Sequence, residues 1–240
     1  MHSAVIGRAS MRHSHRILST RRVSVALRVM IVAAASACVR HQSTMAAGRS
    51  PSFRLMPDGK QWLTKNLSLA VPGSSCYRGE AQMCLQYGRL YTWDAAQEAC
   101  RAVGRGWRLP ADNEWGLLSK AYGGVDGESA DSGKGAYRSL ITGGRSEFNA
   151  MLGGGADAEA RVYSRVDAHG FYWTASASGV AGATFMNFAG EGQALHRQPD
   201  GDKQRAFSVR CVRDTSEGET QGATRRLREA AFSRRPSSER

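Results

Sequence analysis

Cysteine placement limits the folds open to this chain more than any other feature. Of five cysteines, Cys38 stands alone near the N-terminus, and the others fall in the region that could form a globular domain: Cys76, Cys84, Cys100 and Cys211. In an exported chain, where thiols oxidise, four cysteines can pair in three ways, and their spacing does not choose among these. We therefore expect a disulfide-stapled domain, with Cys38 left over outside it.

The first fifty residues support export. They contain eight arginines and no acidic residue, and "RRVSVALR" leads into the apolar stretch "VMIVAAASA" at residues 29–37. Nine residues are too few to span a bilayer, which takes about 20 helical residues, so we predict a signal peptide over residues 1–37. Cleavage after Ala37 would give a secreted protein, whereas lipidation of Cys38 within "ASAC" would give an outer membrane lipoprotein. Residues 38–55 are then a linker.

Charge and metal-ligand patterns exclude two classes of function. The net charge of +12 comes mostly from the N-terminal arginines, because residues 51–213 carry 19 basic and 16 acidic side chains. No basic helix or lysine-arginine run lies in that region, so we expect no nucleic-acid partner. No C-x-x-C sequence occurs, and four of the six histidines lie in the first fifty residues. We therefore expect no bound metal and no cofactor.

Two helices are predicted from capping and periodicity. The first begins at Thr92, presents Ala96, Cys100 and Val103 on one face, and ends at Gly104. The second begins inside "GWRLPADNEW" (residues 106–115), with Ala111 or Asp112 as its cap, and stops at Gly123-Gly124. If Ala111 is the cap, Glu114 forms half of a capping box whose serine or threonine is missing. The helix would then bury Trp115, Leu118 and Tyr122.

Short strands are predicted elsewhere, at residues 60–67, 171–176, 183–189 and 206–212. The glycine-rich region 123–170 is expected to form turns and loops, and the polar, arginine-rich tail over residues 214–240 is expected to be disordered. Gln198, Pro199 and Asp200 match a triplet that binds calcium and galactose in some C-type lectins. No W-N-D triplet follows, so we expect a tight turn at Pro199-Asp200-Gly201 instead.

Seven blocks in order resemble the Fibrobacter succinogenes major paralogous domain family: "DGKQWLTKNL", "CYRGEAQMC", "YGRLYTWDAAQEAC", "GWRLPADNEW", "FNAMLGGG", "GFYWTAS" and "FSVRCVR". The resemblance covers about Met56 to Arg213. It implies an α+β, C-type lectin-like fold, in which two helices pack on short twisted antiparallel sheets with long loops, and a distant similarity to the formylglycine-generating enzyme group. It also implies the disulfides Cys76–Cys84 and Cys100–Cys211.

The resemblance implies that "GWRLPADNEW" has a structural role and helps to fix the fold. The alternative is that Arg108 and Glu114 bind a ligand, although an arginine in such a place more often pairs with a carboxylate or with carbonyl groups. With the cysteines committed to disulfides, no catalytic arrangement stands out.

We therefore expect a non-catalytic binding or adhesion module in the bacterial cell envelope or outside the cell. Its partner would be an unknown glycan or protein ligand at the cell surface, bound through loops, and its membrane contact would be the lipid on Cys38. Candidate binding residues are Tyr163, His169, Asn187, His196 and Arg197. The alternatives are an enzyme of the formylglycine-generating type and a structural component of an envelope assembly.

Overall fold

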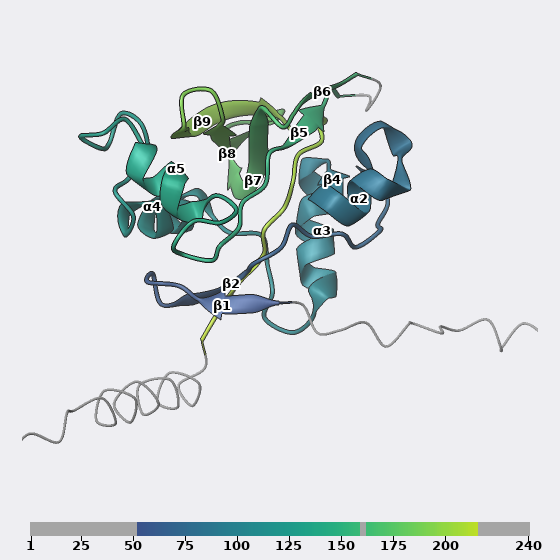
Figure 1. The fold of residues 1–240 in the computed structure, drawn as a ribbon. Coiled ribbons are helices and arrows are strands. Elements are labelled where there is room, and N and C mark those ends of the chain that lie inside the picture. Colours follow the sequence, from purple (N-terminus) through teal and green to yellow (C-terminus); the bar gives the residue numbers. More distant parts are fainter. Residues whose placement is uncertain (1–51, 159–161, 216–240) are drawn as a thin grey trace, which may run out of the picture. The chain divides into compact units, whose positions relative to one another are not determined.

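The computed structural model describes residues 52–158 and 162–215 (Figure 1). The predicted signal peptide, the predicted lipid anchor at Cys38 and the tail beyond residue 215 lie outside the described residues.

The described chain has its helices before residue 141 and its longest strands after residue 168, as in an α+β fold. The helices are α2 (Ala81–Tyr87), α3 (Trp93–Val103), α4 (Asp112–Lys120) and α5 (Lys134–Leu140), with a 3-10 turn η2 (Tyr77–Gly79) before α2. The strands are β1 (Phe53–Leu55), β2 (Lys60–Leu63), β3 (Ser74–Ser75), β4 (Leu90–Tyr91), β5 (Gly153–Ala156), β6 (Tyr163–Val166), β7 (His169–Ala177), β8 (Gly182–Ala189), β9 (Ala194–Asp202) and β10 (Val212–Asp214).

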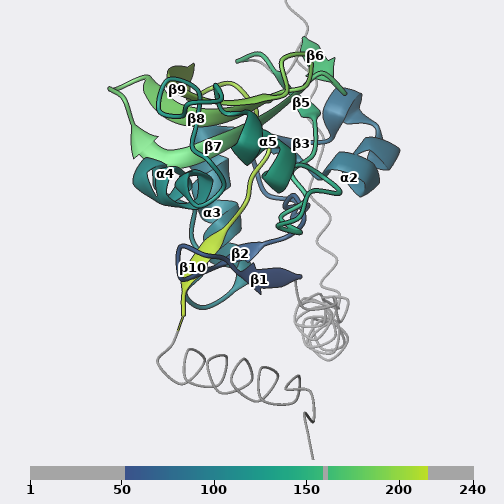
Figure 2. The same ribbon diagram turned by 60° about the vertical axis from the view of Figure 1, so that its left-hand side comes forward.

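The described strands form three sheets. The larger sheet has the order β6-β5-β7-β8-β9, the smaller sheet has the order β1-β2-β10, and β3 pairs with β4 in a sheet of two strands (Figures 1 and 2). The smaller sheet brings the two ends of the domain together, because β1 and β10 both pair with β2 in antiparallel register. The folded part therefore extends beyond the boundaries expected at residues 56 and 213: β1 lies in the expected linker, and Asp214 of β10 pairs with Lys60.

Aromatic side chains fill the core on both sides of the larger sheet. On one side, Trp62 and Trp115 are fully buried and meet edge to face, with ring centroids 5.0 Å apart. On the other side, Trp173 packs on Phe207 at 4.5 Å, in the same cluster as Cys100 and Cys211. Aromatic pairs of this kind contribute about 0.5 to 1.5 kcal/mol beyond the area that they bury.

Both predicted helices are present. In α3, Thr92 holds the N-cap position without a side-chain cap bond, and the chain leaves the helix at Gly104. In α4, the Glu114 carboxylate accepts a bond from the backbone N–H of Ala111 at 2.8 Å. Since alanine has no side-chain oxygen, this contact is the glutamate half of a capping box, as predicted.

The number of helices was predicted wrongly. Helices α2 and α5 have seven residues each, and the sequence "KGAYRSL" of α5 lies between glycine-rich segments without a clear apolar period. Residues 123–170 are therefore not all turns and loops, since they also contain β5 and β6. Tertiary packing provides what the local pattern lacks: Ala136 and Leu140 of α5 are fully buried.

Two strand predictions were also wrong in extent. Only residues 60–63 of the segment 60–67 form a strand, and residues 206–208 form isolated bridges rather than a ladder. The second segment is fully buried, and its residues hydrogen bond to several parts of the chain: Phe207 to Tyr91, and Ser208 to Phe171 and Trp173. Alternate residues of this segment therefore face two different buried regions, one on each side of the segment.

The turn predicted at Pro199-Asp200-Gly201 is instead part of β9. Gly201 pairs with Ala183 and Gln198 pairs with Phe185, so Pro199 and Asp200 stand opposite one residue of β8 and form a bulge. A proline is tolerated at a bulge because the ladder is interrupted there. Glycine is needed at position 201, since a Cβ would lie 2.7 Å from the Phe185 ring and 2.9 Å from the Trp173 ring.

Candidate functional site

The five candidate binding residues lie on strands, not on loops as expected. Tyr163 is in β6, His169 in β7, Asn187 in β8, and His196 and Arg197 in β9. The larger sheet brings three of them together. Asn187 is directly opposite His196 on one side, and it is hydrogen bonded to His169 on the other.

These three residues form a sheet-face cluster with Phe171 and Arg165. Cross-strand partners share one face of a sheet, and Asn187 stands opposite both Phe171 and His196. His169 stacks on Phe171, with ring centroids 5.4 Å apart and planes 15° apart. His169 Nδ1 lies 2.9 Å from Asn187 Oδ1, and Nε2 lies 3.4 Å from Arg165 Nη1. Both nitrogens of the His169 ring are therefore engaged within the cluster.

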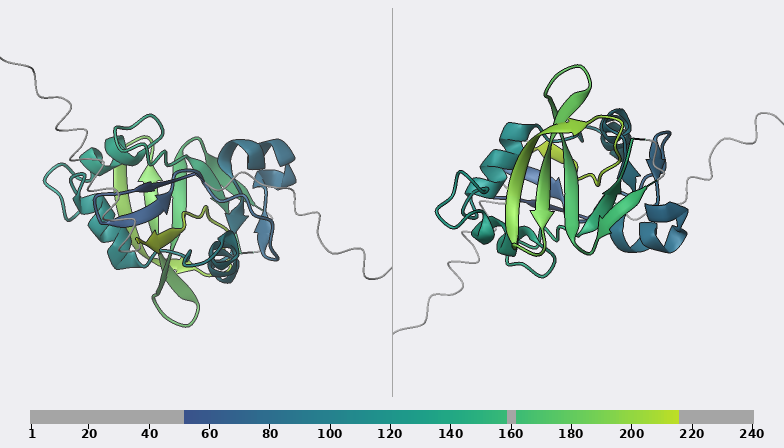
Figure 3. Two further views of the ribbon diagram at one scale, coloured as in Figure 1. Left: turned by 90° about the horizontal axis from the view of Figure 1, so that it is seen from below. Right: turned by 90° about the horizontal axis from the view of Figure 1, so that it is seen from above.

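The sheet-face cluster lies on the face opposite α4 and α5, where α3 and the segment before β10 cover the neighbouring residues Trp173 and Phe185. Helices α4 and α5 pack on the other face, where Trp115 meets Tyr172 and Tyr137 meets Phe188. Figure 3 (right) shows the larger sheet in front of the helices. Phe171, Asn187 and both histidines are half-buried, and Arg165 is exposed. The Phe171 ring packs on Phe185 and Phe207, with ring centroids 6.0 and 5.1 Å apart, so the cluster presents the remaining part of this ring beside amide, imidazole and guanidinium groups.

Tyr163 and Arg197 take part in other contacts. The Tyr163 hydroxyl donates to Ser75 Oγ at 3.2 Å, and its ring lies 5.1 Å from that of Tyr77. Arg197 binds both carboxylate oxygens of Asp112, at the start of α4, and also reaches Glu128. Arg197 therefore ties the edge of the sheet to a helix end, where a negative residue is already favoured.

The "GWRLPADNEW" block pairs its own charges. Arg108 Nη1 and Nη2 donate to the two Glu114 oxygens at 2.6 and 2.7 Å, and Lys60 lies 3.3 Å from the same carboxylate. Burial alone would raise the pKa of Glu114, but Arg108 and the N–H of Ala111 outweigh it and hold the pKa below its ordinary value. With Trp115 fully buried, the block joins α4 to the smaller sheet, as the resemblance implies.

A buried arginine was missed by sequence reasoning. Arg210 has no exposed surface, and its guanidinium donates to Asn66 Oδ1 and to the carbonyl oxygens of Leu63, Phe148 and Asn149. Burial lowers its pKa to about 10. In the alternating pattern of residues 206–212, Arg210 points away from the apolar residues. Such a position predicts exposure to solvent. Nothing local indicated that this face is also a core.

A cleft beside α2 was also missed. It has a volume of about 460 Å³, and we call it the α2 cleft. Its lining residues are Thr64, Lys65, Asn66, Ser68, Cys84, Leu85, Gln86, Gly88, Thr142, Asn149 and Met151. Three chain segments remote in sequence form these walls, so local patterns could not indicate it. Leu85 is 80% exposed at its rim, which is unusual for a leucine on a short helix.

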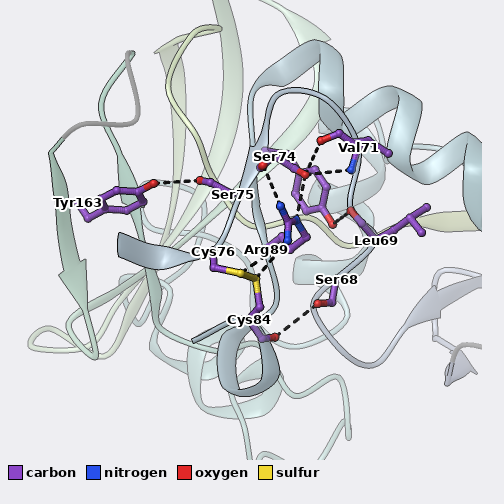
Figure 4. Close-up of a disulfide and its surroundings, with 10 residues drawn as sticks. Ser68, Leu69, Val71, Ser74, Ser75, Cys76, Cys84, Arg89 and Tyr163 are labelled. Atoms are coloured by element: carbon purple, nitrogen blue, oxygen red, sulfur yellow. Dashed lines mark hydrogen bonds between the residues drawn. A yellow bond between two sulfur atoms is a disulfide. The ribbon is translucent and has the colours of Figure 1, made fainter. Parts of the chain in front are cut away.

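The structure contains both disulfides that the resemblance implies, Cys76–Cys84 and Cys100–Cys211. Figure 4 shows the first, with Arg89 beside it. Arg89 Nη1 lies 3.6 Å from Cys76 Sγ and 3.7 Å from Cys84 Sγ. Ser74 holds the guanidinium there through its hydroxyl and its carbonyl oxygen, at 3.0 and 2.9 Å.

Within residues 52–158 and 162–215, no group of three or more acidic, histidine or cysteine side chains is placed to hold a metal ion. In the same ranges, no helix is both long and apolar enough to cross a membrane.

Comparison with known proteins gives one match. A family model described as the Fibrobacter succinogenes major domain matches residues 58–213. The comparison with curated proteins finds no match, and the comparison with solved structures finds none either.

Proposed function

This chain belongs to the Fibrobacter succinogenes major domain family, and we propose that it is a non-catalytic binding module of the bacterial cell envelope. The observation that carries the proposal is the sheet-face cluster. A stacked pair of rings beside an amide and a guanidinium combines apolar contact with directed hydrogen bonds, and sites that bind small ligands combine the same two elements. The ligand would be a glycan or a protein of the cell surface.

The hydrogen bonds of the sheet-face cluster leave donors for a ligand. With Asn187 Oδ1 and both nitrogens of His169 engaged, the described residues offer no partner to Asn187 Nδ2. Arg165 is exposed and holds only one contact of 3.4 Å, to His169. Because the groups stand on paired strands, they are held more rigidly than groups on loops, and less entropy is lost on binding.

The alternative of a formylglycine-generating type of enzyme has less support. Its resemblance would call for a reactive cysteine, and the four cysteines in the described ranges are joined in two disulfides. His196 lies 3.1 Å from Asp126, and the described contacts put no serine or cysteine beside this pair. The pair therefore lacks the nucleophile that such catalysis needs.

We also propose the finer fold assignment, the C-type lectin-like fold. Support comes from short antiparallel sheets joined by long connections, from the meeting of both domain ends in one sheet, and from the disulfide between α3 and the segment before β10. A solution structure or crystal structure whose topology departs from this arrangement would remove that part of the proposal.

Export and lipidation are the last part of the proposal. Two disulfides are compatible with an oxidising compartment. If Cys38 is lipidated, the protein partitions with membranes and Cys38→Ser releases it, since several acyl chains anchor far more firmly than one. Intact mass spectrometry decides the matter: a mature chain that begins at an unmodified Cys38 or Val39 contradicts lipidation.

The binding proposal is tested by screening the purified full chain against glycan and envelope-protein arrays, with and without calcium. We expect a signal that does not require calcium. A strictly calcium-dependent glycan signal that Asp200→Ala abolishes would move the site to the bulge of β9 and contradict the proposal. Association with envelope fractions without any ligand signal would favour the structural alternative.

A further inference from the structure

The two disulfides lie in different surroundings. Cys100 and Cys211 have no exposed surface and belong to the aromatic cluster around Trp173. Cys76 is partly exposed, and Cys84 lines the α2 cleft. An external thiol can therefore approach the Cys76–Cys84 bond in the folded domain, whereas the other bond becomes accessible when the domain opens.

A fixed positive charge stands beside the accessible bond. The same nitrogen of Arg89 lies within 3.7 Å of both sulfurs. Figure 4 shows Arg89 beside the disulfide. Two hydrogen bonds to Ser74 hold the guanidinium group of Arg89 in place. Within the described residues, no carboxylate lies at ion-pair distance from Arg89. A neighbouring cation stabilises a thiolate relative to the thiol, and a sulfur that is more stable as a thiolate leaves a disulfide faster.

We propose that Cys76–Cys84 is a site of thiol–disulfide exchange with an external dithiol, and that Arg89 is a positioning residue that stabilises the departing thiolate. A thiolate of the dithiol attacks Cys76 Sγ, the bond between the two protein sulfurs breaks, and its electron pair leaves on Cys84 Sγ. The second thiolate of the dithiol then attacks the sulfur bound to Cys76, so that Cys76 leaves as a thiolate too.

The exchange balances without another reactant. The dithiol becomes a disulfide and gives up two electrons and two protons, and the protein takes up both as two thiols. Since Cys84, Leu85 and Gln86 line the α2 cleft, loss of the bond frees α2 from the η2 segment and changes the wall of the cleft. The proposal stands on this bond and Arg89, independently of the sheet-face cluster.

Timed reduction of the full chain tests the proposal. Dithiothreitol is the probe, free thiols are trapped by alkylation, and the modified cysteines are counted by peptide mapping. Cys100 and Cys211 serve as an internal control in every sample. We expect Cys76 and Cys84 to be trapped at least about tenfold faster than the control pair, because the second bond waits for opening of the domain. Equal rates in the wild type overturn the proposal.

Variants separate charge from packing. Arg89→Gln is expected to slow reduction of Cys76–Cys84 by about three- to tenfold, and Arg89→Lys to keep most of the rate, since leaving depends on the stability of the thiolate. Arg78→Gln removes a charge from η2, inside the loop that the disulfide closes, where the described residues show no arginine–sulfur contact, and its rate should match the wild type. Equal slowing by the glutamine and lysine variants, or an unchanged rate in Arg89→Gln, would refute the role of Arg89. Loosening of the whole domain would be seen as faster reduction of the control pair.

Discussion

Arg210 Nε donates to Asn66 Oδ1 across 2.9 Å in the interior of the domain, and neither residue reaches solvent appreciably. The same oxygen accepts the Tyr172 hydroxyl at 3.0 Å, while Asn66 Nδ2 donates to the carbonyl oxygen of Tyr87 at 2.8 Å. One asparagine thus links β2's exit, the larger sheet and the end of α2. The described acceptors of the guanidinium are neutral oxygens. A charged group can stay buried among them because each of these hydrogen bonds is made.

The first prediction concerns this network. Arg210→Lys should destabilise the domain by about 3 to 5 kcal/mol, because an ammonium cannot span the four acceptors and leaves buried oxygens unpaired. Urea unfolding of the full chain measures the difference. Arg213→Lys, in a half-exposed position, is the comparison. A loss below about 1 kcal/mol for Arg210→Lys would mean that the network is dispensable.

The second prediction contrasts two tryptophans of the same core cluster. Trp62 Nε1 donates to Asp58 Oδ2 at 2.8 Å, whereas Trp115 Nε1 is buried without a partner among the described residues. Trp62→Phe should therefore cost about 1.5 to 3 kcal/mol more than Trp115→Phe, since it also breaks a bond to a carboxylate. Equal losses in urea unfolding would show that packing alone determines both.

The third prediction is acid sensitivity at Glu114. Its pKa is held below the ordinary value of 4.5, so the carboxylate contributes stability above that value and loses it as the pH falls through the lower folded pKa. Glu114→Gln should be less stable than wild type near neutral pH. The gap between the two should close between about pH 5 and pH 3. Thermal melts across this range test it, and a constant gap would contradict it.

The fourth prediction ranks the disulfides. Cys100 and Cys211 close a loop of 111 residues and the other pair closes one of 8. Replacing the first pair by alanines should cost about 4 to 5 kcal/mol and the second about 2 to 3 kcal/mol on the chain-entropy account. Calorimetry of the two double variants provides the comparison. A larger loss for the short loop would show that native-state contacts outweigh loop closure.

Parts of the fold with a strong local signal could be predicted. Helices α3 and α4 carry caps and an apolar period, and β7 and β8 carry β-branched and aromatic residues between turn signals. Helices α2 and α5 could not be predicted, because seven residues without a clear apolar period become helical only through tertiary packing.

Three residues of the sheet-face cluster are candidates from the sequence alone: His169, Asn187 and His196. Their meeting depends on the register of β7, β8 and β9, which no local pattern specifies. The P-D-G triplet at residues 199–201 predicts a turn, and the structure has a bulge there, because the same three residue types suit both. Arg89 and the α2 cleft depend on contacts between distant segments.

The most direct test of the binding function compares Asn187→Ala with Asn113→Ala on the same glycan and envelope-protein arrays. Both variants lose one amide, but Asn113 is exposed on α4, away from the sheet-face cluster. The account predicts that Asn187→Ala weakens the signal at least about tenfold, the equivalent of one directed hydrogen bond of about 1.4 kcal/mol, and that Asn113→Ala keeps it. Equal signals from the two variants, or no signal from the wild type on either array, would contradict it.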